Sequence, residues 1–419
     1  MARLARLRLA SLCGVLGGAL LLAAAPVAAA GFELVGAADP GTAGFNAMAV
    51  GLDGYAYLGS WGSSAECPAV GARVFDVRDP ARPTLVASAA AYPGTTAEHL
   101  AAVHLDSAAF SGSVLLVGIQ RCSATSGTAG LALWDIGDPT APRELGFFDT
   151  GRGARGVHEL AVGKQGDRWY AYLAVPNSEA VGGPGDLRVV DVTDPANPTA
   201  VADWGARRDA ELPIGNGRAC APVCRGAIPG SFLHSVSLAA DARTAYLSYW
   251  DLGMIVLDVS EPGAPRLIGH YSEPETAEGD THSATVTNGG TLALVTDETV
   301  GPPWGNLRLV DLHDPANPVQ VGTYDTPDSA AGTPGGAYAH SAHNALVDAR
   351  YPNQVLLAWY SDGVRLLDIA DPTAPVERAT WVPPRNPYVW SVQPMGDLLV
   401  VGDINNGLFL LKRPGQPAA

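Results

Sequence analysis

The chain has 419 residues with 26 Lys and Arg against 42 Asp and Glu, which gives a formal net charge of −16. Nucleic acid is an unsuitable partner for such a chain, because binding to the phosphate backbone needs clustered positive charge. Apolar residues make up 47 %, which excludes a disordered chain. The 49 Gly and 33 Pro predict a globular protein with an unusual number of turns.

The first 30 residues have the pattern of a secretion signal, with Arg3, Arg6 and Arg8 ahead of an apolar run. The small residues at 28–30 offer a cleavage site before Gly31. We therefore predict an exported protein that is secreted, periplasmic or held at the cell surface, without a transmembrane segment once the signal is removed. A retained membrane anchor is the alternative. Residues 31–419 are expected to form a single domain.

One phrase of ten residues recurs six times between the signal and the C-terminus. It consists of two apolar residues, Asp, an apolar residue, any residue, Asp-Pro or Glu-Pro, two further residues and Pro. The apolar residues favour a half-buried strand, and Asp-Pro ends it, because Asp bonds back to the turn and Pro has no N–H donor. The copies are VFDVRDPARP from Val74, LWDIGDPTAP from Leu133, VVDVTDPANP from Val189, VLDVSEPGAP from Val256, LVDLHDPANP from Leu309 and LLDIADPTAP from Leu366.

Two more strand patterns lie between successive phrases, a short run such as HSVSLA and a run rich in Tyr, Leu and Val such as TAYLSY. Four antiparallel strands that repeat about every 45 to 65 residues predict a β-propeller. Counting the strands gives seven four-stranded blades, so the fold class expected is all-β. Residues 32–36 supply the missing fourth strand of the last blade, and this N-terminal strand closes the ring.

The phrase, with the strands Leu-Arg-Val-Val-Asp and Leu-Arg-Leu-Val-Asp that open it, resembles the LVIVD repeat of bacterial and archaeal secreted or cell-surface proteins. The resemblance covers residues 32–411. It implies the propeller fold but little about function, because most relatives have no assigned activity. The last copy differs, since Lys412 and Arg413 replace the acidic ending. This difference fits a terminal blade that the N-terminal strand completes.

Histidine recurs at the start of the innermost strands, and five of the nine histidines fall at positions that an alignment of these strands makes equivalent. Innermost strands surround the axis, so these residues are expected to converge at one mouth of the channel. The aligned positions are Asn46, His99, His158, His234, His282, His343 and Trp390.

The five histidines are therefore candidate metal ligands, since converging imidazole nitrogens suit Zn, Cu or Fe. Glu98, Glu159 and Asp280 lie nearby in sequence and could orient the imidazoles. The arrangement is similar, in fold and ring alone, to the axial histidines that hold iron in carotenoid-cleaving oxygenases. In the alternative interpretations, each His bonds a loop carbonyl of the next blade, or the cluster is a pH-sensitive latch.

The long loops all open on the face that carries these histidines, and function usually lies on long loops held by a rigid scaffold. We expect Asn46, Trp390, His340, Asp297 and Asp362 to line a ligand site there. The acidic groups suit Ca²⁺, although solvated rim residues would give the same pattern.

Four of the five cysteines follow the signal, and an even number in an oxidising compartment favours disulfides. Cys67 and Cys122 occupy equivalent loops of adjacent blades, and Cys220 and Cys224 share one long loop. We predict the bridges Cys67–Cys122 and Cys220–Cys224. A four-thiol zinc site and free thiols are the alternatives.

Three functions remain open. The first is a monomeric binding or scaffold module that uses the histidine-lined face for a small molecule, a glycan or a protein, without catalysis. The second is a metal-dependent enzyme, most plausibly an oxidoreductase. The third is Ca²⁺-assisted adhesion at the cell surface. The sequence favours the first, because scaffolding needs no added assumption.

Overall fold

Strands make up nearly all the regular structure of the protein. The computed structural model describes residues 31–62, 67, 69–123, 127–151, 154–216, 220, 223–274 and 277–415. The proposed secretion signal at 1–30 lies outside these residues. In the described part of the chain, none of the helices has the length and apolar content needed to cross a membrane.

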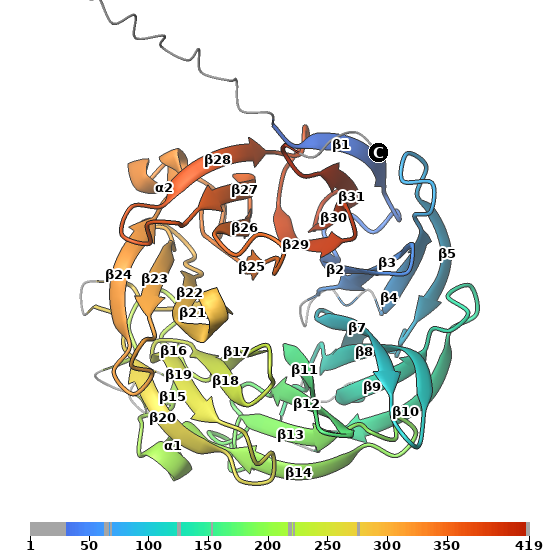
Figure 1. The fold of residues 1–419 in the computed structure, drawn as a ribbon, viewed down its shortest axis with the longest axis horizontal. Helices are drawn as coiled ribbons and strands as arrows, with labels where there is room; N and C mark the ends of the chain where they lie inside the picture. Colours follow the sequence, from blue (N-terminus) through green and yellow to red (C-terminus); the bar gives the residue numbers. More distant parts are fainter. Residues whose placement is uncertain are drawn as a thin grey trace, which may run out of the picture.

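Seven four-stranded antiparallel sheets stand as blades around a central axis, as predicted (Figure 1). The first strand of each blade is the innermost, and the long apolar second and third strands form the buried middle of the blade. The first four blades in chain order are β2–β5 (Asn46–Leu52, Tyr55–Ser60, Ala72–Asp76, Thr84–Ala89), β7–β10 (Leu100–Asp106, Ser111–Arg121, Gly130–Asp135, Arg143–Asp149), β11–β14 (Leu160–Gln165, Arg168–Ala174, Leu187–Asp191, Thr199–Trp204) and β17–β20 (Leu233–Leu238, Thr244–Tyr249, Gly253–Asp258, Arg266–Tyr271).

The last blade joins the two ends of the described chain. Strand β1 pairs with β31 in the register Leu34↔Leu411 to Ala38↔Leu408, so the N-terminal strand closes the ring as predicted. The remaining blades are β21–β24 (Thr281–Thr287, Leu292–Asp297, Leu307–Asp311, Val319–Tyr324), β25–β28 (Ala345–Val347, Gln354–Trp359, Gly363–Asp368, Val376–Trp381) and the closing blade β29–β31 with β1 (Val389–Met395, Leu398–Asp403, Gly407–Lys412, Glu33–Ala38).

Short strands and helices lie in the connections between the blade strands. The short strand β6 extends the second blade by pairing with β8, and β15 pairs with β16 in a two-stranded ribbon. The bounds of these elements are β6 (Thr95–Thr96), β15 (Gly215–Asn216), β16 (Gly230–Ser231), α1 (Ala206–Ala210), α2 (Pro327–Ala331) and η2 (Asn288–Gly290).

The Asp residues of the repeated phrase shape the turn as the sequence predicts. In the sixth copy the Asp368 carboxylate accepts the N–H of Ala370 at 2.9 Å, and the Asp371 carboxylate accepts the N–H of Thr373 at 3.0 Å. The backbone bond lowers the pKa of Asp368, and the Thr373 hydroxyl together with its N–H lowers that of Asp371, so the turns are held by charged acceptors at neutral pH.

Both disulfides are present. Cys67–Cys122 joins the loop after β3 to the end of β8 in the adjacent blade, with Cα atoms 5.9 Å apart. Cys220–Cys224 closes a local loop between β15 and β16, with Cα atoms 5.6 Å apart. Each bridge therefore holds a loop on the face that the sequence assigns to ligand binding.

Adjacent blades meet where the proline carbonyl of one Asp-Pro turn rests on a glycine in the fourth strand of the preceding blade. A Cβ atom on Gly322 would lie 2.1 Å from the Pro372 carbonyl oxygen, and one on Gly269 would lie 2.1 Å from that of Pro315. The same strand that closes the ring makes this contact, since a Cβ on Gly36 would lie 2.0 Å from the Pro80 oxygen. A side chain at these positions would force the blades apart.

We expect Gly322→Ala to lower the free energy of unfolding by about 1–3 kcal/mol, because the added methyl group overpacks the contact between two blades. Denaturant unfolding of the full chain measures the change. Gly336→Ala is the matched control, since a Cβ there meets no atom within 4 Å. Equal stability of the two variants would contradict the blade contact.

Candidate metal centre

Four histidines occupy one structural position on four consecutive blades. His158 and His343 lie two residues before the first paired residues of β11 and β25, and His234 and His282 are the second residues of β17 and β21. Each stands at a β-bulge. In the third blade the Ala174 carbonyl accepts the N–H of His158 at 2.9 Å, and the Ala174 N–H donates to the backbone carbonyl of Glu159 at 2.9 Å. Two residues of the inner strand, His158 and Glu159, therefore lie opposite the single residue Ala174. A bulge reorients the side chain of the extra residue.

The four imidazoles form a continuous arc of rings in the channel. Their centroids are 4.3 Å apart between His158 and His234, 4.2 Å between His234 and His282, and 4.1 Å between His282 and His343. The Nε2 atoms of His158 and His234 are 2.8 Å apart. All four residues are buried.

In two of the four histidines, Nδ1 is hydrogen-bonded to the backbone of the next blade. His234 Nδ1 donates to the carbonyl of His282 at 3.1 Å, and His343 Nδ1 donates to the carbonyl of Trp390 at 2.6 Å, each on the next blade. This fixes the tautomer and leaves a lone pair on Nε2. His343 Nε2 is buried without a hydrogen-bond partner among the described residues. In metal-ligating histidines the ring nitrogen that does not bind the metal typically donates such a hydrogen bond to a backbone carbonyl.

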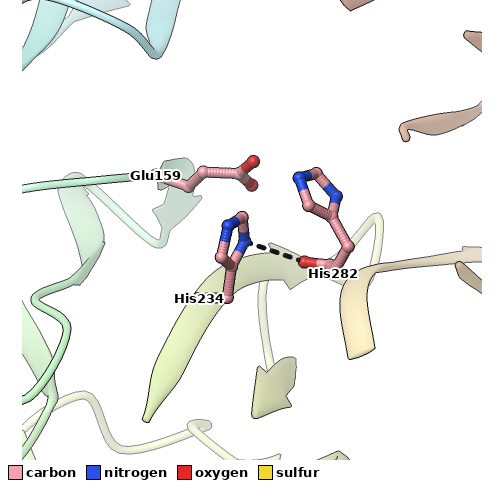
Figure 2. A group of neighbouring side chains, drawn as sticks. All are labelled: Glu159, His234 and His282. Atoms are coloured by element: carbon pink, nitrogen blue, oxygen red, sulfur yellow. Dashed lines mark hydrogen bonds between the residues drawn. The ribbon is translucent and has the colours of Figure 1, made fainter. Parts of the chain in front are cut away.

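Three glutamates surround the arc. Glu98 Oε2 lies 2.8 Å from His158 Nδ1. The Glu159 carboxylate lies with His234 and His282, their potential ligand atoms within 4.8 Å of one another, and all three side chains point toward one space (Figure 2). Glu298 forms a similar group with His282 and His343. The Tyr360 hydroxyl donates to Glu298.

Burial governs the charges at this centre. It lowers the pKa of His158 to about 3, and it lowers those of His234, His282 and His343 well below their usual value with the help of neighbouring imidazoles. Burial also raises the pKa of Glu98 and Glu159 well above the usual range and that of Glu298 to about 8. The imidazoles are therefore neutral at pH 7, the state in which they bind metals.

The predicted alignment is wrong by one residue in two blades. Leu100 pairs with Val117 in the second blade as Leu160 pairs with Leu173 in the third. The Gly118 N–H donates to the backbone carbonyl of His99, just as the Ala174 N–H donates to that of Glu159. Glu98 is therefore equivalent to His158, and His99 is equivalent to Glu159. The sequence contains a signal for this register in the segments Glu-His-Leu at 98–100 and His-Glu-Leu at 158–160, because aligning their buried Leu residues gives the observed pairing.

Asn46 has the same displacement, because Asn46 pairs with Ser60 as Leu233 pairs with Tyr249, so Ala47 stands at the histidine position. The Asn46 side chain donates to the Ile404 carbonyl at 2.9 Å and accepts from Arg73 at 2.9 Å. These bonds assign Asn46 to the contact between the first and last blades.

Of the other residues predicted for the ligand face, Trp390 lies at the histidine arc, whereas Asp297, Asp362 and His340 are bonded to other partners. Trp390 belongs to the centre, with its ring centroid 4.4 Å from that of His343. Asp297 is ion-paired with Arg308 at 2.5 Å, and Asp362 bonds His340 Nδ1 at 2.6 Å. Asp280, expected beside the histidines, is fully buried, and burial raises its pKa to about 10. Glu298 takes the place that the sequence assigned to Asp280.

Two cavities lie along the channel, one on each side of the arc. The first, of about 510 Å³, is lined by all four histidines and by aromatic side chains from the loops and from inner strand β29. The second, of about 490 Å³, is lined by His99, Glu159 and the small polar residues that follow the histidines in the inner strands. The aromatic residues of the first cavity are Trp61, Phe232, Trp250, Tyr338, Tyr360, Tyr388 and Trp390.

The fold defines this chain as a β-propeller, and three of its segments are similar to the LVIVD repeat. The LVIVD-repeat profile matches residues 169–204, 243–273 and 300–326, which confirms the resemblance seen in the Asp-Pro phrases. No curated protein matches the chain by sequence.

Solved structures support the fold alone. A provisionally assigned 6-phosphogluconolactonase from Bacteroides uniformis ATCC 8492 is similar with a TM-score of 0.52 and 12% identity over 81% of this chain and 87% of that one. The WD40 β-propeller domain of Doa1 is similar with a TM-score of 0.54 and 12% identity over 92% of this chain and 97% of that one.

The inner histidines make the metal-free protein sensitive to acid. Burial lowers the pKa of His99 from 6.5 to about 3, so the unfolded chain binds one more proton than the folded chain between these values. This proton lowers the free energy of unfolding by up to about 1.4 kcal/mol for each pH unit below 6.5.

We expect His99→Gln to remove this slope of one proton in chelator-treated protein, measured by denaturant unfolding at pH 7, 6, 5 and 4. The raised glutamate pKa values act in the opposite direction, so the test is the difference between variant and parent. His313→Gln, on an exposed turn, is the control. Parallel curves for His99→Gln and the parent would contradict the buried neutral imidazole.

Proposed function

We propose that this protein is an exported β-propeller that binds one transition-metal ion at His158, His234, His282 and His343 and admits a small organic ligand to it through the loop-side cavity. One observation carries the proposal: four buried neutral imidazoles form one arc in the channel, and His282 shares candidate ligand groups with His234 and Glu159 on one side and with His343 and Glu298 on the other. Imidazole nitrogens with carboxylates behind them suit Zn, Cu or Fe.

The residues present fit a bound cation. Folding has placed several polar groups in the channel without giving them protein partners, including His343 Nε2 and His282 Nδ1 among the described residues. Unsatisfied buried polar atoms are rare in native proteins and often mark a site whose ligand completes them. A cation would also lower the raised pKa values of Glu98, Glu159 and Glu298. The carboxylates would then ionise, and their negative charge would balance that of the ion.

A metal supplies Lewis-acid or redox chemistry where it is bound, which makes an oxidoreductase the enzymatic form of this proposal. The chain's own residues have other tasks. The backbone carbonyls of His282 and Trp390 hold the imidazoles of His234 and His343 in orientation, and aromatic side chains line the cavity beside them. Export is supported by the two disulfides, which persist in oxidising compartments.

Elemental analysis of the purified protein tests the proposal. We expect about one transition-metal ion per chain, either as isolated or after chelator treatment and reloading with Zn²⁺, Cu²⁺ or Fe²⁺ separately. His234→Ala combined with His282→Ala should lose the ion, while circular dichroism and a cooperative thermal transition show that the propeller remains folded. His104→Ala is the control, because His104 is exposed and pairs with Asp53. A parent protein that binds none of these ions, or a double variant that keeps its metal, would refute the metal centre.

The glutamates should tune the affinity rather than create it. We expect Glu159→Gln to weaken metal binding by about 10- to 100-fold, because groups behind the ligands orient them and stabilise the charge. Competition with a chromophoric chelator measures the change. Glu144→Gln is the control, since Glu144 is exposed and bonds Tyr92 in an outer strand. Unchanged affinity in Glu159→Gln would place this carboxylate outside the centre.

A further inference from the structure

The wall of the first cavity presents carbon rather than polar atoms. Trp250 Nε1 donates to the Ile228 carbonyl at 3.1 Å, and the Tyr388 hydroxyl donates to the Ala337 carbonyl at 2.7 Å. The Tyr360 hydroxyl donates a hydrogen bond to the Glu298 carboxyl group. Since these polar ends are bonded to the protein, the rings offer mainly their faces and edges to a ligand, which suits a flat apolar body.

Aromatic rings lie directly against the histidine arc. The Trp250 ring centroid is 5.2 Å from that of His234 and stacks on Phe232 at 5.6 Å. The Trp61 centroid is 5.8 Å from that of His158, at one end of the arc, and 6.1 Å from that of Trp390, which lies beside His343 at the other end. An aromatic ligand that enters between these walls therefore reaches the imidazoles.

One cationic side chain lines this cavity. Among its described lining residues, Arg155 is the only Lys or Arg. The Arg155 carbonyl accepts the Arg121 N–H at 2.7 Å, which ties its backbone to β8. Within the described part of the chain no carboxylate forms an ion pair with its guanidinium, although its charge acts on Glu98 and His158. The guanidinium is exposed at the rim and available to an anion.

We propose that the cavity binds a small aromatic carboxylate, with its ring between Trp61 and Trp250 and its carboxylate on the Arg155 guanidinium. A planar guanidinium binds a carboxylate through two parallel hydrogen bonds, and aromatic rings pack on aromatic walls. A volume of about 510 Å³ accommodates a ligand of this size. The inference deepens the ligand half of the proposed function and rests on the same cavity, but it does not require the metal.

Titration calorimetry with three probes tests this assignment. The probes are trans-cinnamate, its neutral isostere cinnamamide, and 3-cyclohexylpropanoate, which is charged but not planar. We expect cinnamate to bind at least about tenfold more tightly than either of the others, because it alone uses both the guanidinium and the aromatic walls.

Two variants separate the contributions. Arg155→Gln should weaken cinnamate at least about tenfold and leave cinnamamide within about twofold. Arg78→Gln is the matched control, because Arg78 pairs with Asp76 in an exposed turn of the first blade. Trp250→Leu should weaken cinnamate and cinnamamide alike, with the thermal transition confirming that each variant is folded.

The outcomes distinguish this inference from the metal proposal. Cinnamate binding to chelator-treated protein that loses affinity on Arg155→Gln supports the inference, even where no metal is ever bound. No binding of any probe, equal binding of cinnamate and cinnamamide, or equal loss of both on Arg155→Gln would overturn it. Cinnamate that binds only metal-loaded protein and ignores Arg155→Gln would overturn it as well, since the carboxylate would then depend on the metal.

Discussion

Strand β1 pairs with strand β31, and this contact between the two ends of the described chain closes the ring. Closure gives the last blade its fourth strand and makes the seven inner strands share one axis. Gly36 in β1 also receives the Pro80 turn of the first blade, so one short strand completes a sheet and packs against the next. Because the blades cannot turn independently, residues at the same register position on their inner strands are held at the same height in the channel.

The histidine arc shows how this constraint becomes a site. Two interpretations of the histidines compete in the sequence, a hydrogen bond to the neighbouring blade and a metal ligand. In His234 and His343 the two roles belong to different atoms of one ring, since Nδ1 bonds the next blade while Nε2 faces His158 Nε2 in His234 and has no described partner in His343. The bond to the next blade therefore orients the imidazole, as the proposed metal site requires. Burial keeps these rings neutral, and Glu159 and Glu298 lie where the charge of an ion would be balanced.

The long loops complete the site on one side. They bring Trp61, Trp250 and Tyr360 over the arc, and two disulfides hold the loops that carry or border them. The rigid part of the molecule thus supplies the nitrogens, and the loops supply the ligand-binding walls and Arg155. This division is typical of propellers and other scaffolds in which variable loops stand on invariant strands. It explains why the acidic residues Asp297 and Asp362 have internal partners, Arg308 and His340: they position the loops.

The sequence alone determined the number of blades, the closing strand, the Asp turns and the cysteine pairs, because each depends on a local pattern that repeats: period-two strands, Asx turns and equivalent loops. It also placed histidines in the inner strands. Only the tertiary structure decided which residues converge. The β-bulge at the start of each inner strand adds one residue that no period-two pattern records, so Glu98 rather than His99, and Ala47 rather than Asn46, occupies the position equivalent to the four histidines. Glu298 joins from the end of a second strand, and it meets His343 only because the blade β21–β24 packs against the blade β25–β28.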